Sequence, residues 1–151
     1  MLTCHPIDSC TIPELLALLN DARVRRYLML HAPFTASSAD DWLQVKQAED
    51  RRPGCLIRAI RNGADLVGWC GIQKQDDSFE LAIVLAPSQW SRGRDVLATL
   101  KTWGRQQGHT SLVALLPSSR PQRRAIARLF GQPSSETVLQ GTVFNRYTIA
   151  L

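Results

Sequence analysis

The stretch from Glu80 to Asp95 carries the residues whose types and spacing are best suited to chemistry. An apolar strand, a short basic loop and a helix follow one another here, and the unpaired N–H groups at a helix start attract anions. Gly93 would let the backbone approach such a ligand closely. Arg92 and Arg94 add positive charge, and Ser91 offers a hydroxyl donor. Because the loop matches neither the P-loop pattern G-x-x-x-x-G-K-S/T nor the dinucleotide pattern G-x-G-x-x-G, we predict a pyrophosphate site of another kind.

The positive charge of the chain is concentrated around this loop. The net charge is +5 over 151 residues, but residues 88–131 hold eight basic residues against one acid, and the remainder is slightly acidic. This distribution predicts a local anion site, and the alternative is a helix face whose arginines contact only water. Binding to nucleic acid, which would fall steeply with salt, is the weakest alternative. Since neither interleaved aromatic residues nor a reading helix is visible, we expect no nucleic-acid partner.

The composition is that of an ordinary globular protein. Apolar residues make up 44% and charged residues 21% of the chain, which excludes collagen, coiled coil and disorder. The longest nearly apolar run, residues 81–87, is far shorter than the about 20 residues that cross a bilayer, and no secretory signal opens the sequence. We expect a cytoplasmic protein with no membrane partner. The four cysteines form no C-x-x-C pair and the three histidines are scattered, so we expect buried thiols and no metal site.

The order of helix and strand signals predicts an α+β fold in one domain, residues 1–151. Thr11, Pro13 and Glu14 open a helix. Asn62-Gly63 is a strong hairpin signal, and Gln140-Gly141 marks a second tight turn. The sheet should be mixed and mostly antiparallel, with six to seven strands flanked by about four helices. The predicted helices are 12–20, a short piece in 21–30, 37 to about 50, 95–107 and one ending at Gly131; the predicted strands are 55–61, 65–73, 79–86, 111–116 and two in 138–151.

A known loop pattern, E-x-x-x-x-L-x-P-x-x-W-G-x-G, is largely present at Glu80, Leu85, Pro87, Trp90, Ser91 and Gly93. With the segment 66–71, these residues resemble the ribosomal-protein and aminoglycoside branch of the GNAT N-acetyltransferase superfamily, over nearly the whole chain. The resemblance implies a GNAT-like fold and acetyl-coenzyme A (acetyl-CoA) as cofactor. Trp90 stands where the superfamily's Q/R-x-x-G-x-G/A loop has glutamine or arginine, and Asp95 stands where that loop ends in glycine or alanine. Ser91 replaces the glycine that often follows the tryptophan. Asp95 is either an acid at the helix start or the ion-pair partner of Arg92 or Arg94.

The resemblance also assigns roles to single residues. Glu80 would be the catalytic base, although a carboxylate on a wet sheet face is the alternative; strand alternation sets it opposite Phe79, Leu81 and Ile83. Backbone N–H groups along residues 83–85, where related domains have a bulged strand, would stabilise the oxyanion. The family's tyrosine acid has no counterpart, because Ala127 occupies its position. The implied cofactor-binding residues are Ile83, Val84, Leu85, Trp90, Ser91, Arg92, Gly93, Arg94, Asp95, Ser119, Arg120 and Arg123.

The early helices would cover the acceptor side of the site. Tyr27, His31 and Phe34 are the candidate substrate residues, together with Trp42, although aromatic residues are often simply core. In the helix that opens near residue 37, Trp42, Val45 and Ala48 predict the buried face.

The resemblance implies an acetyl-CoA-dependent N-acetyltransferase that moves the acetyl group directly to a primary amine in a ternary complex. The acceptor would be a small-molecule amine, a protein N-terminus or a lysine side chain. The departures in the loop leave a second hypothesis open, namely a catalytically inactive acyl-CoA-binding or regulatory module of the same fold. The apolar C-terminal hairpin would offer a surface for a homodimer.

Overall fold

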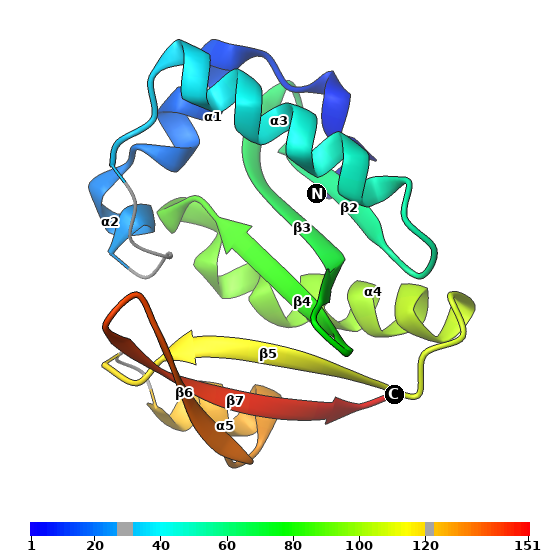
Figure 1. The fold of residues 1–151 in the computed structure, drawn as a ribbon. Coiled ribbons are helices and arrows are strands. Elements are labelled where there is room, and N and C mark those ends of the chain that lie inside the picture. Colours follow the sequence, from blue (N-terminus) through cyan, green and yellow to red (C-terminus); the bar gives the residue numbers. More distant parts are fainter. Residues whose placement is uncertain (27–31, 120–122) are drawn as a thin grey trace.

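The computed structural model describes residues 1–26, 32–119 and 123–151, and it has the predicted α+β architecture (Figure 1). Seven strands form one mixed sheet in the order β1-β2-β3-β4-β5-β7-β6, in which only β4 and β5 run parallel. None of the described helices is long and apolar enough to cross a lipid bilayer. The elements are β1 (Leu2–Pro6), η1 (Ile7–Ser9), α1 (Ile12–Leu19), α2 (Ala22–Arg25), α3 (Ala36–Asp50), β2 (Leu56–Asn62), β3 (Asp65–Gln75), β4 (Ser78–Leu85), η2 (Pro87–Arg92), α4 (Gly93–Gln106), β5 (Ser111–Pro117), α5 (Arg123–Phe130), β6 (Ser135–Leu139) and β7 (Thr142–Ala150).

Local signals set most of these boundaries. The Thr11 hydroxyl accepts from the Glu14 N–H and the Glu14 carboxylate accepts from the Thr11 N–H, a capping box that starts α1. Gly63 adopts a φ of 64° in the β2–β3 turn, and Gln140 and Gly141 adopt φ values of 50° and 79° in the β6–β7 turn. These turns therefore lie where the sequence predicts them.

The helices cover both faces of the sheet. α1 and α3 pack on one face, where Leu15, Ile57 and Trp69 belong to one buried cluster. α4 lies on the opposite face, where Ile72 and Leu100 belong to a second cluster. Figure 1 shows β4 and β5 close together at one end and diverging toward the other.

Several boundaries differ from the predictions. β1 is an additional edge strand that pairs with β2. With five residues, this strand is too short to show a clear alternation of apolar and polar side chains. β6 begins at Ser135, three residues before the predicted start. α4 begins at Gly93, two residues before the predicted start, because the preceding loop is itself a 3-10 helix that leads directly into α4.

Cys4 is exposed on the edge strand β1, so the expectation of four buried thiols is wrong at that position.

Candidate active site

The two halves of the sheet separate between β4 and β5. β4 pairs with β3, and β5 pairs with β7, along their whole lengths. The parallel ladder between β4 and β5, both fully within the described residues, contains the single pair Glu80 and Val113. A cavity of about 540 Å³ opens where the strands part, with walls from β4, β5, α3, α5 and the loop after β4.

The cavity arises without the expected strand bulge. β4 keeps one continuous register with β3 from Ser78 to Leu85, whereas the register shift in this region lies between Ile60 and Arg61 of β2. The expectation of a bulge at Ile83–Leu85 is therefore wrong. The strands part instead because each follows its own antiparallel neighbour, and Ile83, Val84 and Leu85 all line the opening.

Glu80 lies at the point where the strands part, on the predicted face. Phe79, Leu81 and Ile83 pack in the cluster on the α4 side, so alternation directs Glu80 to the α3 side, where it lines the cavity. Burial raises the pKa of the Glu80 carboxyl, and the negative charge of Glu49 raises it further. The positive charges of Lys46 and Arg146 act in the opposite direction and lower this pKa. A half-buried carboxylate with a raised pKa is a suitable proton acceptor.

The loop after β4 forms one rim of the cavity. The Trp90 indole N–H donates a hydrogen bond of 2.9 Å to the carbonyl oxygen of Leu85, the last residue of β4. This bond ties η2 to the end of the strand. Arg92 precedes α4 as its N-cap and makes no side-chain capping hydrogen bond there. The Gly93 N–H already donates to the Trp90 carbonyl oxygen, so an anionic group at this end of α4 would meet the N–H groups that follow Gly93 in the first turn.

Asp95 is paired with Arg92. The Arg92 Nε donates to a carboxylate oxygen of Asp95 at 3.0 Å, and both side chains are largely exposed. Of the two roles considered for Asp95, the ion pair is thus present, and Asp95 also lies in the first turn of α4. The pair neutralises the carboxylate that would otherwise repel a phosphate at this helix end.

Gly93 leaves open space at the start of α4. A Cβ placed on Gly93 would meet no atom of the described residues within 4 Å, and the backbone φ is −55°, which any residue adopts. Neither packing nor backbone strain in the protein itself requires a glycine here. The absence of a side chain leaves the backbone accessible to a ligand in the cavity, which Gly93 lines.

The opposite wall of the cavity is aromatic. Phe34 and Trp42 make an edge contact with ring centroids 6.5 Å apart, and Trp42 contacts Trp69 in the same way at 5.4 Å. The Asn20 side chain fixes this wall, because it accepts from the Phe34 N–H at 2.8 Å and donates to the Phe34 carbonyl at 2.9 Å. Trp69 is buried, and its indole N–H has no hydrogen-bond partner among the described residues.

The face of α3 toward the sheet differs from the predicted one. Val45 is 55% exposed and Ala48 is also exposed, so the predicted face of Trp42, Val45 and Ala48 is wrong beyond Trp42. Lys46 and Glu49 line the cavity instead. The spacing of residues 42, 46 and 49 places them along one helical side, but two of these residues are charged, so apolar periodicity does not reveal this face.

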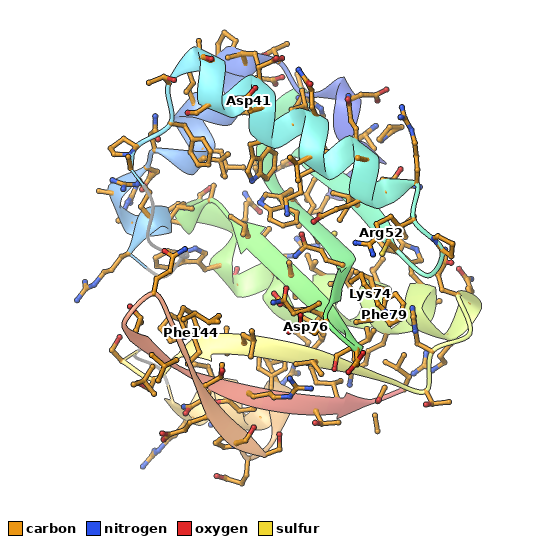
Figure 2. All side chains as sticks on the ribbon, in the orientation of Figure 1. Asp41, Arg52, Lys74, Asp76, Phe79 and Phe144 are labelled. Carbon is orange, nitrogen blue, oxygen red and sulfur yellow. The ribbon has the colours of Figure 1, made fainter. Side chains whose placement is uncertain are left out.

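The remaining predicted residues lie around the entrance or outside the described chain. Ser91, Arg94 and Ser119 are exposed and do not line the cavity. The site predictions for Tyr27, His31 and Arg120 fall outside the described residues, and only the backbone of Arg123 is described, at the start of α5. In Figure 2, Lys74, Asp76 and Phe79 lie near one end of β4, and Phe144, which lines the cavity, lies toward the other.

A second cavity of about 510 Å³ lies between α5 and β7 and is lined by Ala127, Asn145 and Tyr147. Tyr147 is 5% exposed and packs against Phe130 at 5.6 Å, in the cluster on the face opposite Glu80. Tyr147 is therefore not positioned to act beside Glu80. The described residues include no group of three or more His, Cys, Asp or Glu side chains that could hold a metal.

Comparison with protein families gives one match, the acetyltransferase (GNAT) domain, over residues 2–119. This range contains the first five strands, Glu80 and the whole loop from Trp90 to Asp95. No curated protein sequence matches the chain.

Solved structures share the fold at low sequence identity. The Salmonella typhimurium acetyltransferase that modifies the N-terminal serine of the ribosomal protein L7/L12 superposes with a TM-score of 0.78 at 16% identity, covering 99% of this chain and 95% of that one. The microcin C7 self-immunity acetyltransferase MccE, solved with acetyl-CoA and AMP, gives a TM-score of 0.76 at 14% identity, covering 99% and 92%. A GCN5-related N-acetyltransferase from Brucella melitensis gives 0.75 at 16% identity, covering 99% and 75%.

Proposed function

The chain belongs to the acetyltransferase (GNAT) domain family, and we propose that it transfers the acetyl group of acetyl-CoA directly to a primary amine with Glu80 as the base. GNAT enzymes use acetyl-CoA as their acetyl donor. The observation that carries the proposal is the place of Glu80, a half-buried carboxylate where β4 and β5 part and a cavity begins. A cavity between two strands can hold an extended ligand against exposed strand backbone.

The coenzyme would enter along the loop and the start of α4. Its pyrophosphate would lie on the N-terminal N–H groups of this helix, beside Gly93, whose backbone is open on that side. Arg94 would add charge from the exposed rim, and the ion pair with Asp95 holds Arg92 in place. Ser91 and Trp90 would complete this part of the site. We also propose that Arg120, Arg123 and Arg124 hold the coenzyme's 3′-phosphate, and Ser119 remains a proposed cofactor-binding residue.

The acetyl group would lie against the edge of β4 beyond Glu80. Ile83–Leu85 is paired with β3 on one edge, but its other edge borders the cavity, because the ladder to β5 contains only the Glu80–Val113 pair. The backbone N–H groups on this second edge would donate to the oxygen that becomes negative when an amine attacks the thioester. This arrangement keeps the proposed oxyanion donors on a strand that is fixed by β3.

In the proposed reaction the amine nitrogen attacks the thioester carbon while Glu80 accepts a proton from the nitrogen, directly or through water. The C–S bond then breaks, the amide forms and the coenzyme leaves as a thiolate. A thiol has an ordinary pKa near 8.5, so its anion is a good leaving group at neutral pH without an obligatory acid. The reaction therefore does not require the tyrosine whose position Ala127 occupies.

The acceptor would lie against the aromatic wall. Phe34 and Trp42 line the cavity on the side of α3, and Tyr27 and His31 remain proposed contacts. Membership of the ribosomal-protein and aminoglycoside branch remains part of the proposal. The structural neighbour that modifies the N-terminal serine of a ribosomal protein makes a protein N-terminus one candidate acceptor, beside lysine side chains and small-molecule amines.

The test is calorimetric titration with acetyl-CoA, followed by thiol-release assays with a serine-terminated tetrapeptide, lysine amide, spermidine, free amino acids and an aminoglycoside. We expect binding, and turnover with at least one amine. Glu80→Gln should lower kcat on the order of 100-fold with coenzyme affinity nearly unchanged. The matched control, Glu136→Gln, alters an exposed carboxylate on β6 and should leave kcat unchanged.

Each failure has a separate meaning. Binding without turnover across the panel would favour the inactive acyl-CoA-binding module, and absence of binding would remove the coenzyme site from this cavity. Turnover that Glu80→Gln leaves intact would exclude Glu80 as the base while keeping the acetyltransferase assignment.

A further inference from the structure

Lys46 is a buried cation inside the cavity. Its side chain is only 13% exposed, and its ammonium lies 3.2 Å from a Glu49 carboxylate oxygen. The ammonium also donates to the side-chain oxygen of Gln73 and lies 4.9 Å from the ring centroid of Trp69. A buried charge is costly unless it is paired and hydrogen-bonded. Lys46 has both kinds of partner, so the cation is held in one place.

Gln73 connects this cation to Glu80. The register of β3 and β4 places Gln73 directly opposite Glu80, and side chains of such a pair lie on the same face of the sheet. The partner of the Lys46 ammonium is thus the cross-strand neighbour of the Glu80 carboxylate. All four side chains, Lys46, Glu49, Gln73 and Glu80, line the same cavity.

Among the described residues, the charges that act on the Glu80 carboxyl come from α3 and β7. α3 contributes Lys46 and Glu49, and β7 contributes Arg146, whose guanidinium donates to the Ser78 hydroxyl at 3.0 Å. Gln73 of β3 and Val113 of β5 are uncharged neighbours. Burial raises the pKa of Glu80, Lys46 lowers it, Glu49 raises it and Arg146 lowers it. Lys46 therefore opposes the effect of burial on the proposed base.

We propose that Lys46 is a positioning residue that serves as the fixed counter-charge of Glu80 in acetyl transfer, held for that task by Glu49 and Gln73. The inference rests on the proposed role of Glu80. Lys46 exchanges no proton with the substrate; its charge stabilises the ionised carboxylate that must accept the amine's proton. Glu49 anchors Lys46 and at the same time opposes it electrostatically. The two residues therefore act on Glu80 with opposite signs.

These opposite signs give a direct test that needs no acceptor. The carboxyl carbon of Glu80 is followed by ¹³C NMR through a pH titration, and Glu80→Gln identifies its resonance. In Lys46→Met the titration midpoint should move to higher pH, and in Glu49→Gln, whose amide still accepts from Lys46, it should move to lower pH. The direction of each change, rather than its size, is the result that tests the inference.

Three comparisons separate a charge effect from a structural one. Lys46→Arg keeps the charge and should restore the midpoint toward that of the wild type. Lys101→Met removes the same charge from α4, on the other face of the sheet, and should move the midpoint less than Lys46→Met. Coenzyme affinity, measured by calorimetry with acetyl-CoA, should be unchanged in Lys46→Met.

The inference is overturned if the Glu80 midpoint is the same in Lys46→Met as in Lys101→Met. It is also overturned if Lys46→Met and Glu49→Gln move the midpoint in the same direction. Should Lys46→Met not fold, Lys46→Gln removes the same charge with a polar side chain, and its midpoint decides in the same way. Failure of the proposed function is a different result, since it appears as turnover that survives Glu80→Gln whatever the NMR midpoints are.

Discussion

Replacing Gly93 with valine should weaken coenzyme binding while leaving the free protein intact. In the part of the chain that the structure describes, an added Cβ meets no atom within 4 Å, and the backbone φ of −55° suits any residue. Gly93 is the first residue of α4, and valine has a somewhat better helix propensity than glycine, so Tm should not fall. The new side chain would occupy only the space that we assign to the pyrophosphate.

The size of the effect follows from the hydrogen bonds that the ligand would lose. A hydrogen bond to a charged group contributes about 1.5–3 kcal/mol. Displacing the pyrophosphate from one N–H group of α4 should therefore raise Kd for acetyl-CoA between about 10-fold and about 150-fold. Gly93→Ala, which adds one methyl group, should give a smaller increase.

Calorimetric titration with acetyl-CoA measures this change directly. Ala98→Val is the matched control, because it places a valine at an exposed position of α4 that does not line the cavity. The affinity of this variant for acetyl-CoA should equal that of the wild type. If Gly93→Val binds acetyl-CoA as tightly as the wild type, the pyrophosphate does not lie over Gly93 and the reasoning from this loop is refuted.

Two further predictions concern stability. Hydrogen bonds from Arg61 hold the pKa of Glu14 at about 2, against 4.5 ordinarily, so the ion pair stabilises the protein above pH 4.5 and is lost as pH falls toward 2. Glu14→Gln should lower the free energy of unfolding by about 1 kcal/mol at neutral pH, since the ion pair is partly exposed. In urea titrations, the difference in unfolding free energy between wild type and variant should shrink as the pH falls. A difference that stays constant with pH would contradict this. A Cβ at Gly68 would clash with the carbonyl oxygen of Val84, so Gly68→Ala should lower the free energy of unfolding by about 1–3 kcal/mol, whereas Gly93→Ala should not lower it. Equal urea midpoints for the two variants would refute this.

Short-range patterns in the sequence determined the elements and the face that carries Glu80. The Thr11 capping residue and the Gln140-Gly141 turn act through neighbours a few residues away, so they can be recognised without the rest of the chain. The turn after Gln75 also places Gln73 opposite Glu80, because antiparallel register follows from the position of the turn. The anion-binding character of the loop before α4 has the same local origin.

Tertiary structure alone decided how these parts form a site. The parting of β4 and β5 depends on each strand following a different neighbour, β3 or β7, and no pattern within a strand specifies its partner. The inward face of α3 also became evident only in the tertiary structure. An apolar pattern predicted that Val45 is buried, but Val45 is exposed, and Lys46 and Glu49 line the cavity. Local interactions fix elements within a few residues, whereas the site combines residues from α3, β3, β4 and β7, whose positions depend on the packing of the whole sheet.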